Sequence, residues 1–275
     1  MLERLWLVPV GFIIGAYGTL IGAGGGFVLV PMLILLYPHE SPEVITSISL
    51  AVVFFNALSG SLAYMRMKRV DYRSGILFAA ATIPGAILGA LTTSFIPRHL
   101  FDISLGVLLI IASLFLIFHT DKGNNGKRRV VLRGYLTRNL IEEDGTSHTF
   151  SYSPALGIGL SLIVGYVSSL LGIGGGIIHV PALVHLLNFP VHIATATSHF
   201  ILAIMALTGT GVHIVTGAFH HGIRRTIALA IGVLIGAQLG ALLSNRVRGV
   251  WIIRGLAIAL GLVGIRILIL ALLPL

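Results

Sequence analysis

A glycine-rich motif occurs twice in this chain. Residues 18–31 read GTLIGAGGGFVLVP, and residues 168–181 read SSLLGIGGGIIHVP. Seven of these fourteen positions are identical: Leu20/Leu170, Gly22/Gly172, Gly24/Gly174, Gly25/Gly175, Gly26/Gly176, Val30/Val180 and Pro31/Pro181. Further matches follow downstream, with Ile45–Ser49 against Ile193–Thr197 and Gly85–Leu91 against Gly236–Leu242. The chain therefore contains an internal repeat.

The composition identifies the environment in which this repeat folds. Of the 275 residues, 56% are apolar and 10% are Asp, Glu, Lys or Arg, and the mean hydropathy is +1.00. A soluble domain carries roughly 25% charged residues, so this chain has too little polar surface for a water-soluble enzyme. The absence of cysteine from the sequence excludes disulfides, thiolate zinc sites and iron–sulfur clusters. The sequence predicts one polytopic membrane protein.

Long tracts without a charged residue locate the membrane segments. They cover residues 5–39, 44–65, 74–97, 103–120, 145–223 and 226–245, and a further apolar segment covers about 250–272. One helical span needs about 20 apolar residues. We therefore expect an all-α membrane fold with two homologous repeats, each of about four helical segments. This gives about 8 membrane segments, or up to about 10 where half-helices are counted separately.

A polar segment separates the two repeats. We assign residues 1–120 to the first transmembrane repeat, 121–153 to the linker and 154–275 to the second repeat. The net charge of the chain is +9, and many of its basic residues lie in the linker. Because basic residues collect on cytoplasmic loops, we expect a cytoplasmic linker in a multi-pass plasma-membrane protein. We interpret the linker as a flexible, solvated loop, whose basic stretch can also contact anionic lipid headgroups.

Each glycine motif interrupts a hydrophobic segment that is too long for one straight crossing. Residues 5–37 or 155–188 would reach roughly 50 Å as a single helix, against a hydrocarbon core of about 30 Å. If each segment is one broken crossing, each repeat has four crossings and the repeats are parallel. If each folds back as a re-entrant hairpin, each repeat has three crossings and the repeats are inverted. The positive-inside rule does not choose, because both arrangements place equal numbers of basic residues on the linker side.

The glycine runs lack the features of nucleotide-binding loops. The dinucleotide fingerprint needs a glycine where this chain has Phe27 and Ile177, and a P-loop needs a Gly-Lys-Ser/Thr sequence that is absent here. Glycines instead allow non-helical backbone, and the half-helix that begins after them points free N–H groups and a positive dipole end at the break. The alternative is that the glycines serve only close helix packing. We favour an anion site built from Gly22, Gly24, Gly25, Gly26, Gly172, Gly174, Gly175 and Gly176.

The acidic and hydroxyl residues support an anionic substrate. Every Asp and Glu lies at a predicted span end or in the linker, whereas a cation carrier is expected to keep a carboxylate at mid-depth. Hydroxyl residues follow each glycine segment and can donate hydrogen bonds to an anion, although they also serve as interhelical contacts. The candidate hydroxyls are Thr46, Ser47, Ser49, Thr195, Thr197 and Ser198.

Most histidines lie in the second half of the chain. His179 lies inside the second glycine motif and His199 in the next predicted span. Because histidine titrates near neutrality, both are candidates for proton coupling, and packing by hydrogen-bonded histidines is the alternative. His199 and His213 would lie about 21 Å apart on one helix, which is too far to share a metal. We expect Gly85-x-x-x-Gly89 and Gly236-x-x-x-Gly240 to be helix contacts, and Gln238, beside the latter pair, is a candidate lining residue.

The doubled motif, followed each time by a Thr/Ser-rich helix start, resembles the sulfite exporter TauE/SafE family. The resemblance covers the chain outside the linker. It implies a membrane transporter of sulfur-containing anions such as sulfite, thiosulfate or organosulfonates, in which the two glycine runs and the Thr/Ser clusters form the anion path. His179 matches no role that we can carry over from the family.

The sequence therefore predicts a transporter, with no catalytic residues, no cofactor and no bound metal. Its partners would be a small anion and the lipid bilayer, without nucleic acid, and a homo-oligomer is left open. Two alternatives come from other classes: a His-dependent metal or cation permease, and an intramembrane enzyme. The enzyme is disfavoured because the sequence has no Gly-x-Ser-x-Gly or His-Glu-x-x-His motif.

Overall fold

The computed structural model of the chain is almost entirely helical, as the hydrophobic tracts predict. It describes residues 5–119, 134–244 and 249–272. Its helices are α1 (Leu7–Ile21), α2 (Gly26–Leu36), α3 (Pro42–Arg66), α4 (Tyr72–Thr93), α5 (Arg98–His119), α6 (Pro154–Leu171), α7 (Gly176–Pro181), α8 (Val191–Val215), α9 (Ile223–Ser244) and α10 (Gly249–Leu272). The π-helical turn η2 (Ala182–Leu186) continues α7, and the 3₁₀ turn η3 (Ala218–His221) precedes α9. Two short strands, β1 (Leu136–Ile141) and β2 (Ser147–Tyr152), complete the fold.

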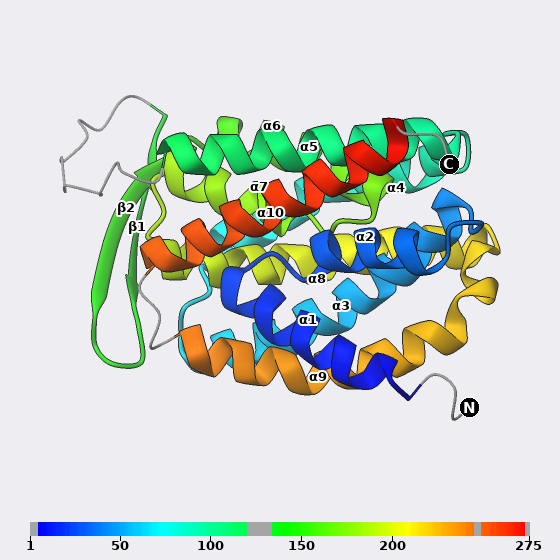
Figure 1. Cartoon of the computed structure of the whole chain (residues 1–275). Coiled ribbons are helices and arrows are strands. Elements are labelled where there is room, and N and C mark those ends of the chain that lie inside the picture. The colour runs from blue at the N-terminus through cyan, green and yellow to red at the C-terminus, as the bar shows by residue number, and fades with distance from the viewer. Residues whose placement is uncertain (1–4, 120–133, 245–248, 273–275) are drawn as a thin grey trace.

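Six helices within the described residues are long and apolar enough to cross a membrane. They are α3, α4, α5, α6, α8 and α9, with mean hydropathies between 1.6 and 2.6. In Figure 1 the long helices lie roughly along one direction, with β1 and β2 at one end and the start of α1 at the other. The prediction of a polytopic helical membrane protein is confirmed.

Helices α1 and α2 form a re-entrant hairpin. The first arm, α1, runs parallel to α9, because Gly11 packs against Leu229 and Ala16 against Gly240. Helix α9 begins beside Arg225, whose guanidinium pairs with Glu40, just beyond the end of α2 (2.7 Å). The start of α1 and the end of α2 therefore lie at the same end of the molecule, as Figure 1 shows. The first glycine motif is the tip of this hairpin rather than a break in one crossing.

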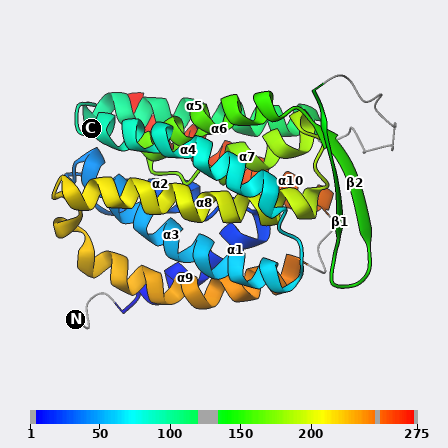
Figure 2. The same ribbon diagram turned by 180° about the vertical axis from the view of Figure 1, so that it is seen from behind.

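Helices α6 and α7 form a second hairpin that opens toward the opposite end. Helix α6 runs parallel to α4, since Gly157 packs against Phe78 and Gly89 against Tyr166. The chain returns through α7 and η2 to Phe189, whose ring lies 4.3 Å from that of Phe150 in β2. Figure 2 shows this end from behind, with the strands beside the start of α6. The two hairpins thus enter the molecule from opposite ends.

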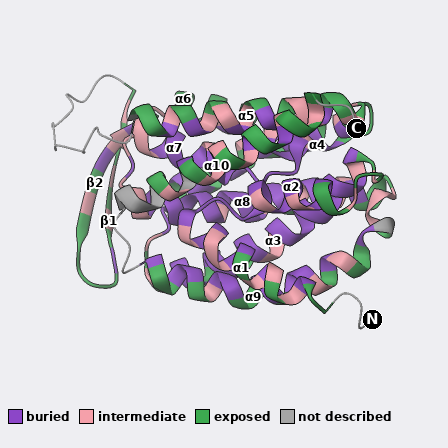
Figure 3. Ribbon diagram, viewed as in Figure 1, coloured by how far each residue is buried: buried purple, intermediate pink, exposed green. Residues whose placement is uncertain are grey.

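Helices α3 and α8 occupy the centre of the molecule. In the most apolar part of α3, 83% of the residues are buried, compared with 33% in the most apolar part of α5. Figure 3 shows buried residues along α3 and α8, and exposed residues on the outward faces of α5, α6 and α9. These outward faces carry large apolar side chains such as Ile163 and Ile235, each 60% exposed, as expected for surfaces that contact lipid.

Glycines bring the outer helices into direct backbone contact. In α9, a Cβ at Gly236 or Gly240 would collide with the carbonyl oxygen of Phe12 or Ala16 in α1. In α4, Gly85 and Gly89 meet the carbonyl oxygens of Leu162 and Tyr166 in α6 in the same way. The prediction that both Gly-x-x-x-Gly pairs are helix contacts is confirmed, and each pair joins one hairpin to a helix from the other half of the chain.

The linker is not a free loop over residues 134–153. Strands β1 and β2 pair antiparallel, from Leu136 opposite Tyr152 to Ile141 opposite Ser147. Phe150 and Tyr152 are buried on one face of β2, so period-two burial rather than solvation decides the conformation. The interpretation of this part as a flexible loop is wrong. The many charged residues of the segment made the short alternation of buried and exposed residues in β2 hard to recognise. The basic residues Lys122, Lys127, Arg128, Arg129 and Arg133 lie outside the described residues.

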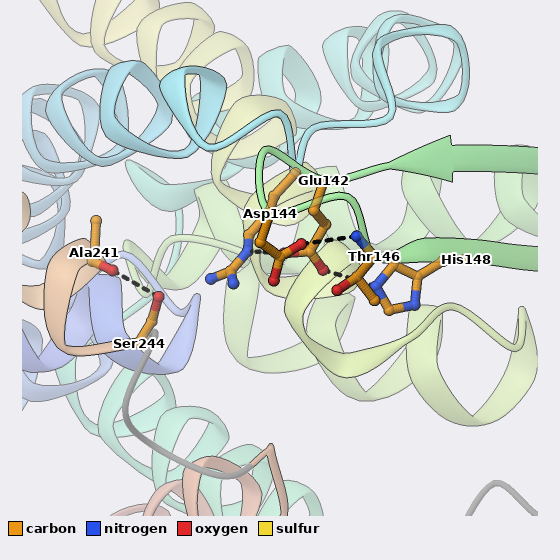
Figure 4. Close-up of polar contacts among 7 residues, drawn as sticks. Glu142, Asp144, Thr146, His148, Ala241 and Ser244 are labelled. Carbon is orange, nitrogen blue, oxygen red and sulfur yellow. Dashed lines mark hydrogen bonds and ion pairs between the residues drawn. The ribbon is translucent and has the colours of Figure 1, made fainter.

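Polar contacts fix this β-hairpin to the ends of α3 and α4. Glu142 pairs with Arg69 (2.5 Å) and with His148 Nε2 (2.7 Å). At the turn, the backbone N–H of Thr146 donates to Asp144, which holds the pKa of Asp144 below its usual value. Figure 4 shows this turn together with the last turn of α9, where Ser244 donates to the carbonyl oxygen of Ala241.

A buried chain of hydroxyls adds a second attachment. The Tyr152 and Ser74 hydroxyls lie 2.5 Å apart, and Ser74 donates to the Asp71 carboxylate at the start of α4. All three residues are buried. The β-hairpin is therefore an integral part of the folded molecule.

We predict that Gly236→Ala destabilises the protein through overpacking between α1 and α9. The added methyl group would meet the Phe12 carbonyl oxygen, and we expect the free energy of unfolding to fall by about 1–3 kcal/mol. Gly159→Ala is the matched control, because nothing lies within 4 Å of a Cβ at that helical position. Thermal unfolding in detergent measures both variants. Equal unfolding temperatures would contradict the packing described for Gly236.

Candidate functional site at the hairpin tips

Left-handed glycines make the turn at each hairpin tip. In the first tip Gly22, Gly24 and Gly25 have φ of 84°, 75° and 80°. In the second tip Gly172 and Gly174 have φ of 69° and 67°. L-residues rarely adopt this region, whereas glycine does so without a steric cost. The breaks therefore follow from the sequence, and α2 and α7 each begin directly after them.

The two tips contact each other in the centre of the molecule. A Cβ at Gly26 would lie 2.5 Å from the carbonyl oxygen of Ile173, and a Cβ at Gly176 would collide with the carbonyl oxygen of Gly22. Only glycine at both positions permits this approach. Helices α2 and α7 thus each begin against the tip of the other hairpin. The first N–H groups of a helix lack intrahelical acceptors, and its N-terminus carries the positive end of the helix dipole.

Two of the predicted hydroxyls contact the tips directly. Ser49 in α3 donates to the Gly172 carbonyl oxygen (2.6 Å), and Ser198 in α8 donates to the Gly22 carbonyl oxygen (3.4 Å). Ser49 and Ser198 make equivalent contacts and lie 149 residues apart, whereas the alignment of Ile45 with Ile193 uses an offset of 148 residues. That alignment is therefore displaced by one residue. The cause is that the connection from the tip to the following helix differs in length between the two halves.

Thr46 and Thr195 contact the tips through carbon atoms only. A Cβ at Gly172 would touch Thr46, and a Cβ at Gly22 would touch Thr195. Their hydroxyls donate within their own helices, to the carbonyl oxygens of Pro42 and Val191. Neither hydroxyl donates into the tips.

Three other predicted residues have partners away from the tips. The Ser47 hydroxyl donates to the Val44 carbonyl oxygen within α3 (2.8 Å). Thr197 accepts from the backbone N–H of Asp71 at the start of α4 (3.1 Å). Gln238 donates to the backbone and hydroxyl oxygens of Ser59 and so joins α9 to α3. These contacts are interhelical or local.

The histidines occupy separate positions. His179 Nε2 lies 3.2 Å from the Ser161 hydroxyl, between the two arms of the second hairpin. His199 Nε2 lies 3.2 Å from the Thr19 hydroxyl, next to the first tip, and His213 Nε2 lies 3.4 Å from the Thr46 hydroxyl. Among the described residues no group of three His, Asp or Glu side chains is placed to hold a metal ion.

The structure adds polar residues that sequence reasoning missed. Thr19 donates to Asn56 Oδ1 (3.1 Å), and the Asn56 Nδ2 group is buried without a hydrogen-bond partner. At the second tip the hydroxyls of Ser168 and Ser169 are likewise buried and unpartnered. A signal for Thr19 was present, since Thr19 and Ser169 occupy the same place in the repeated motif. Asn56 had no such signal, because the corresponding residue in the second half, 149 positions later, is Met205.

Apolar side chains fill the space on the α3/α8 side of the tips. A Cβ at Gly24 would collide with Leu202 and lie 3.2 Å from Val53, and a Cβ at Gly174 would lie 2.7 Å from Val53. Val53 and Leu202 are fully buried. The tips are therefore lined by backbone, hydroxyl, amide and apolar groups.

We predict that Ser49→Ala destabilises the protein by about 1–3 kcal/mol, because a buried carbonyl oxygen at Gly172 loses its donor. Ser47→Ala is the matched control. Its hydroxyl donates only within α3, so we expect a loss below about 1 kcal/mol. Denaturant or thermal unfolding of the purified variants in detergent compares the two. An equal loss in both variants would contradict a special role for the Ser49 contact.

Comparison with known proteins gives a consistent classification. The family model described as sulfite exporter TauE/SafE matches residues 7–267. A probable membrane transporter protein of Bacillus subtilis, YunE, is 34% identical over 270 residues, which cover 95% of this chain and 96% of that protein. A second B. subtilis protein of the same description, YdhB, is 27% identical over 87% of this chain and 89% of its own length. A probable membrane transporter protein of Methanocaldococcus jannaschii is 23% identical over 88% of this chain and 86% of its own length.

No solved structure gives a significant match to the chain. The family match nevertheless spans nearly the whole sequence, and the relatives are described as probable membrane transporter proteins. The chain belongs to the sulfite exporter TauE/SafE family of membrane transporters.

Proposed function

We propose that this transporter carries small sulfur-containing anions, such as sulfite, thiosulfate or organosulfonates, and binds them between the two hairpin tips. The observation that carries the proposal is that α2 and α7 each begin against the tip of the other hairpin in the centre of the molecule. Two helix N-termini there concentrate N–H donors and positive potential. The tips hold no Asp, Glu, Lys or Arg, so an anion would meet neutral donors alone.

We further propose that the two halves are inverted repeats, with the anion held at their interface. The hairpins open at opposite ends, and each hairpin packs its first arm on a helix of the other half. Inverted repeats with discontinuous helices at the midplane are a common plan for secondary transporters that work by alternating access. Three crossings would then follow each hairpin: α3, α4 and α5 in the first half, and α8, α9 and α10 in the second.

We assign proton coupling, where transport is coupled to protons, to His199 rather than His179. His199 is fully buried, contacts Thr19 through Nε2 and lies next to the first tip. His179 bonds Ser161 within the second hairpin, which is a position suited to holding the two arms together. The metal permease alternative gains no support from the described residues, because their histidines do not converge.

We place the protein in the plasma membrane with the linker in the cytoplasm. Arg66, Lys68, Arg69 and Arg73 lie in or beside the loop between α3 and α4, at the same end as the β-hairpin and its Arg138. The opposite end holds Arg98, Arg224 and Arg225. The larger basic group is expected inside.

Single cysteines introduced into this naturally cysteine-free chain test the orientation. We predict that Ser94→Cys, exposed after α4, reacts with a membrane-impermeant maleimide in intact cells. Thr149→Cys, exposed in β2, should react only after permeabilisation. The two sites are matched controls for each other. The reverse pattern would place the linker outside.

Anion flux through proteoliposomes tests the substrate and the site. We predict flux of at least one of sulfite, thiosulfate and a small organosulfonate. Gly26→Ala and Gly176→Ala should lower this flux, because each methyl group pushes the tips apart at a cost of about 1–3 kcal/mol, which corresponds to about 5- to 150-fold in rate.

Gly211→Ala is the control for these variants, since a Cβ there meets nothing within 4 Å. A wild-type protein that moves none of the three anions would overturn the substrate assignment. Undiminished flux in well-folded tip variants would overturn the site.

A further inference from the structure

Asn56 is a polar group whose hydrogen bonds are left incomplete in the middle of the molecule. It lies near the middle of α3 and is fully buried. The Thr19 hydroxyl donates to its Oδ1 (3.1 Å), while Nδ2 has no hydrogen-bond partner. A buried amide left without acceptors lowers stability. Such a group in a native fold requires an explanation.

The surroundings of Asn56 fix its amide and carry no formal charge. Thr19 Oγ1 lies 3.2 Å from His199 Nε2, and the Tyr64 hydroxyl donates to the Thr19 carbonyl oxygen (2.8 Å). Thr19, Tyr64 and His199 are all buried. With Oδ1 engaged by Thr19, both hydrogens of Nδ2 are free to donate to a ligand. The group is therefore oriented to bind an acceptor.

The polar group lies at the first tip and has an unequal counterpart at the second. Thr19 directly follows Gly18, which packs against the backbone of Gly25. At the second tip, Ser168 and Ser169 present hydroxyls without partners, but α8 has Met205 at the place that corresponds to Asn56. Met205 touches the second tip, its sulfur lying 3.2 Å from a Cβ placed on Gly175. The tips thus differ in the donors they offer.

Two apolar side chains contact the tips close to Asn56. Val53, one turn before Asn56 on α3, meets both Gly24 and Gly174, and Leu202 meets Gly24. Both side chains are fully buried. A ligand beside Asn56 would therefore also lie close to these two side chains.

We propose that the transported oxyanion occupies two separate half-sites, and that Asn56 makes the first of them the stronger. The first half-site comprises Thr19, Asn56 and His199, with Asn56 Nδ2 donating to an anion oxygen. The second comprises the hydroxyls of Ser168 and Ser169. Hydrogen bonds to an ionised acceptor are stronger than bonds between neutral groups, and the anion leaves no buried charged side chain behind when it moves on. This inference rests on the proposed anion transport, and it replaces a single position between the tips with one half-site at each tip.

The test compares Asn56→Leu with Met205→Leu. Both changes put leucine at corresponding positions of α3 and α8, but only the first removes an amide donor. The first readout is the rise in unfolding temperature that sulfite, thiosulfate or methanesulfonate causes in detergent, since a ligand that binds only the folded state stabilises it. We expect Asn56→Leu to weaken binding about 10- to 150-fold, which is the loss of one hydrogen bond to a charged acceptor, and Met205→Leu to leave it unchanged.

Proteoliposome flux and the stability of the ligand-free protein complete the test. Asn56→Leu should lose flux with little change in the free energy of unfolding, because removal of the unsatisfied Nδ2 group offsets the loss of the Thr19 hydrogen bond. A purely structural asparagine would lose flux and stability together. If the Asn56→Leu variant does not fold, Asn56→Met is used in its place, because it introduces the side chain found at Met205. The double variant Ser168→Ala with Ser169→Ala should lower flux, whereas the anion should still raise its unfolding temperature.

The outcomes separate this inference from the proposed function. Wild-type flux with an unaltered anion response in Asn56→Leu and Asn56→Met would overturn the half-site and leave anion transport standing. Undiminished flux in the double serine variant would overturn the second half-site. A wild-type protein without flux or stabilisation by any of the three anions would overturn anion transport itself.

Discussion

The contact between the two hairpin tips governs how the surrounding helices are arranged. It requires backbone to approach backbone at Gly26 and Gly176 with no side chain between them. To make that approach, each hydrophobic segment must turn back halfway through the molecule, and left-handed glycines allow the turn. Non-helical backbone at membrane depth is tolerated only where it is buried in protein or lines a water-filled cavity. Helices α3 and α8 provide that cover, and Ser49 and Ser198 each supply a donor to a tip carbonyl oxygen.

The same constraint separates charge from the centre. Ion pairs lie at the two ends of the molecule. Arg225 pairs with Glu40 and stacks over the Tyr37 ring (3.7 Å) at one end, while Arg69 pairs with Glu142 at the other. Between them the tips offer only neutral groups. Under the function proposed above, an anion would pass from charged ends into a centre where backbone and amide donors replace its water.

Much of this arrangement can be predicted from the sequence, because repetition and hydrophobicity are direct physical signals. The glycine motifs predicted the breaks, and the Gly-x-x-x-Gly pairs predicted close helix contacts. The direction of each hairpin could not be predicted, since broken crossings and hairpins place equal numbers of basic residues on the linker side. The β-hairpin was missed because the charges of its segment conceal the alternation that buries Phe150 and Tyr152. Asn56 was missed because it breaks the repeat: its partner at the corresponding position is Met205.

The parallel packing of α1 on α9 and of α6 on α4 has a mechanical consequence. Glycine-to-backbone contacts join each of these pairs along its length, so neither partner can slide or tilt without the other. The units that can move as rigid bodies therefore cut across the two halves of the sequence. One unit consists of the first hairpin packed on α9, a helix of the second half. The other consists of the second hairpin packed on α4, a helix of the first half. Any motion of one unit against the other must act at the tips, where the two meet.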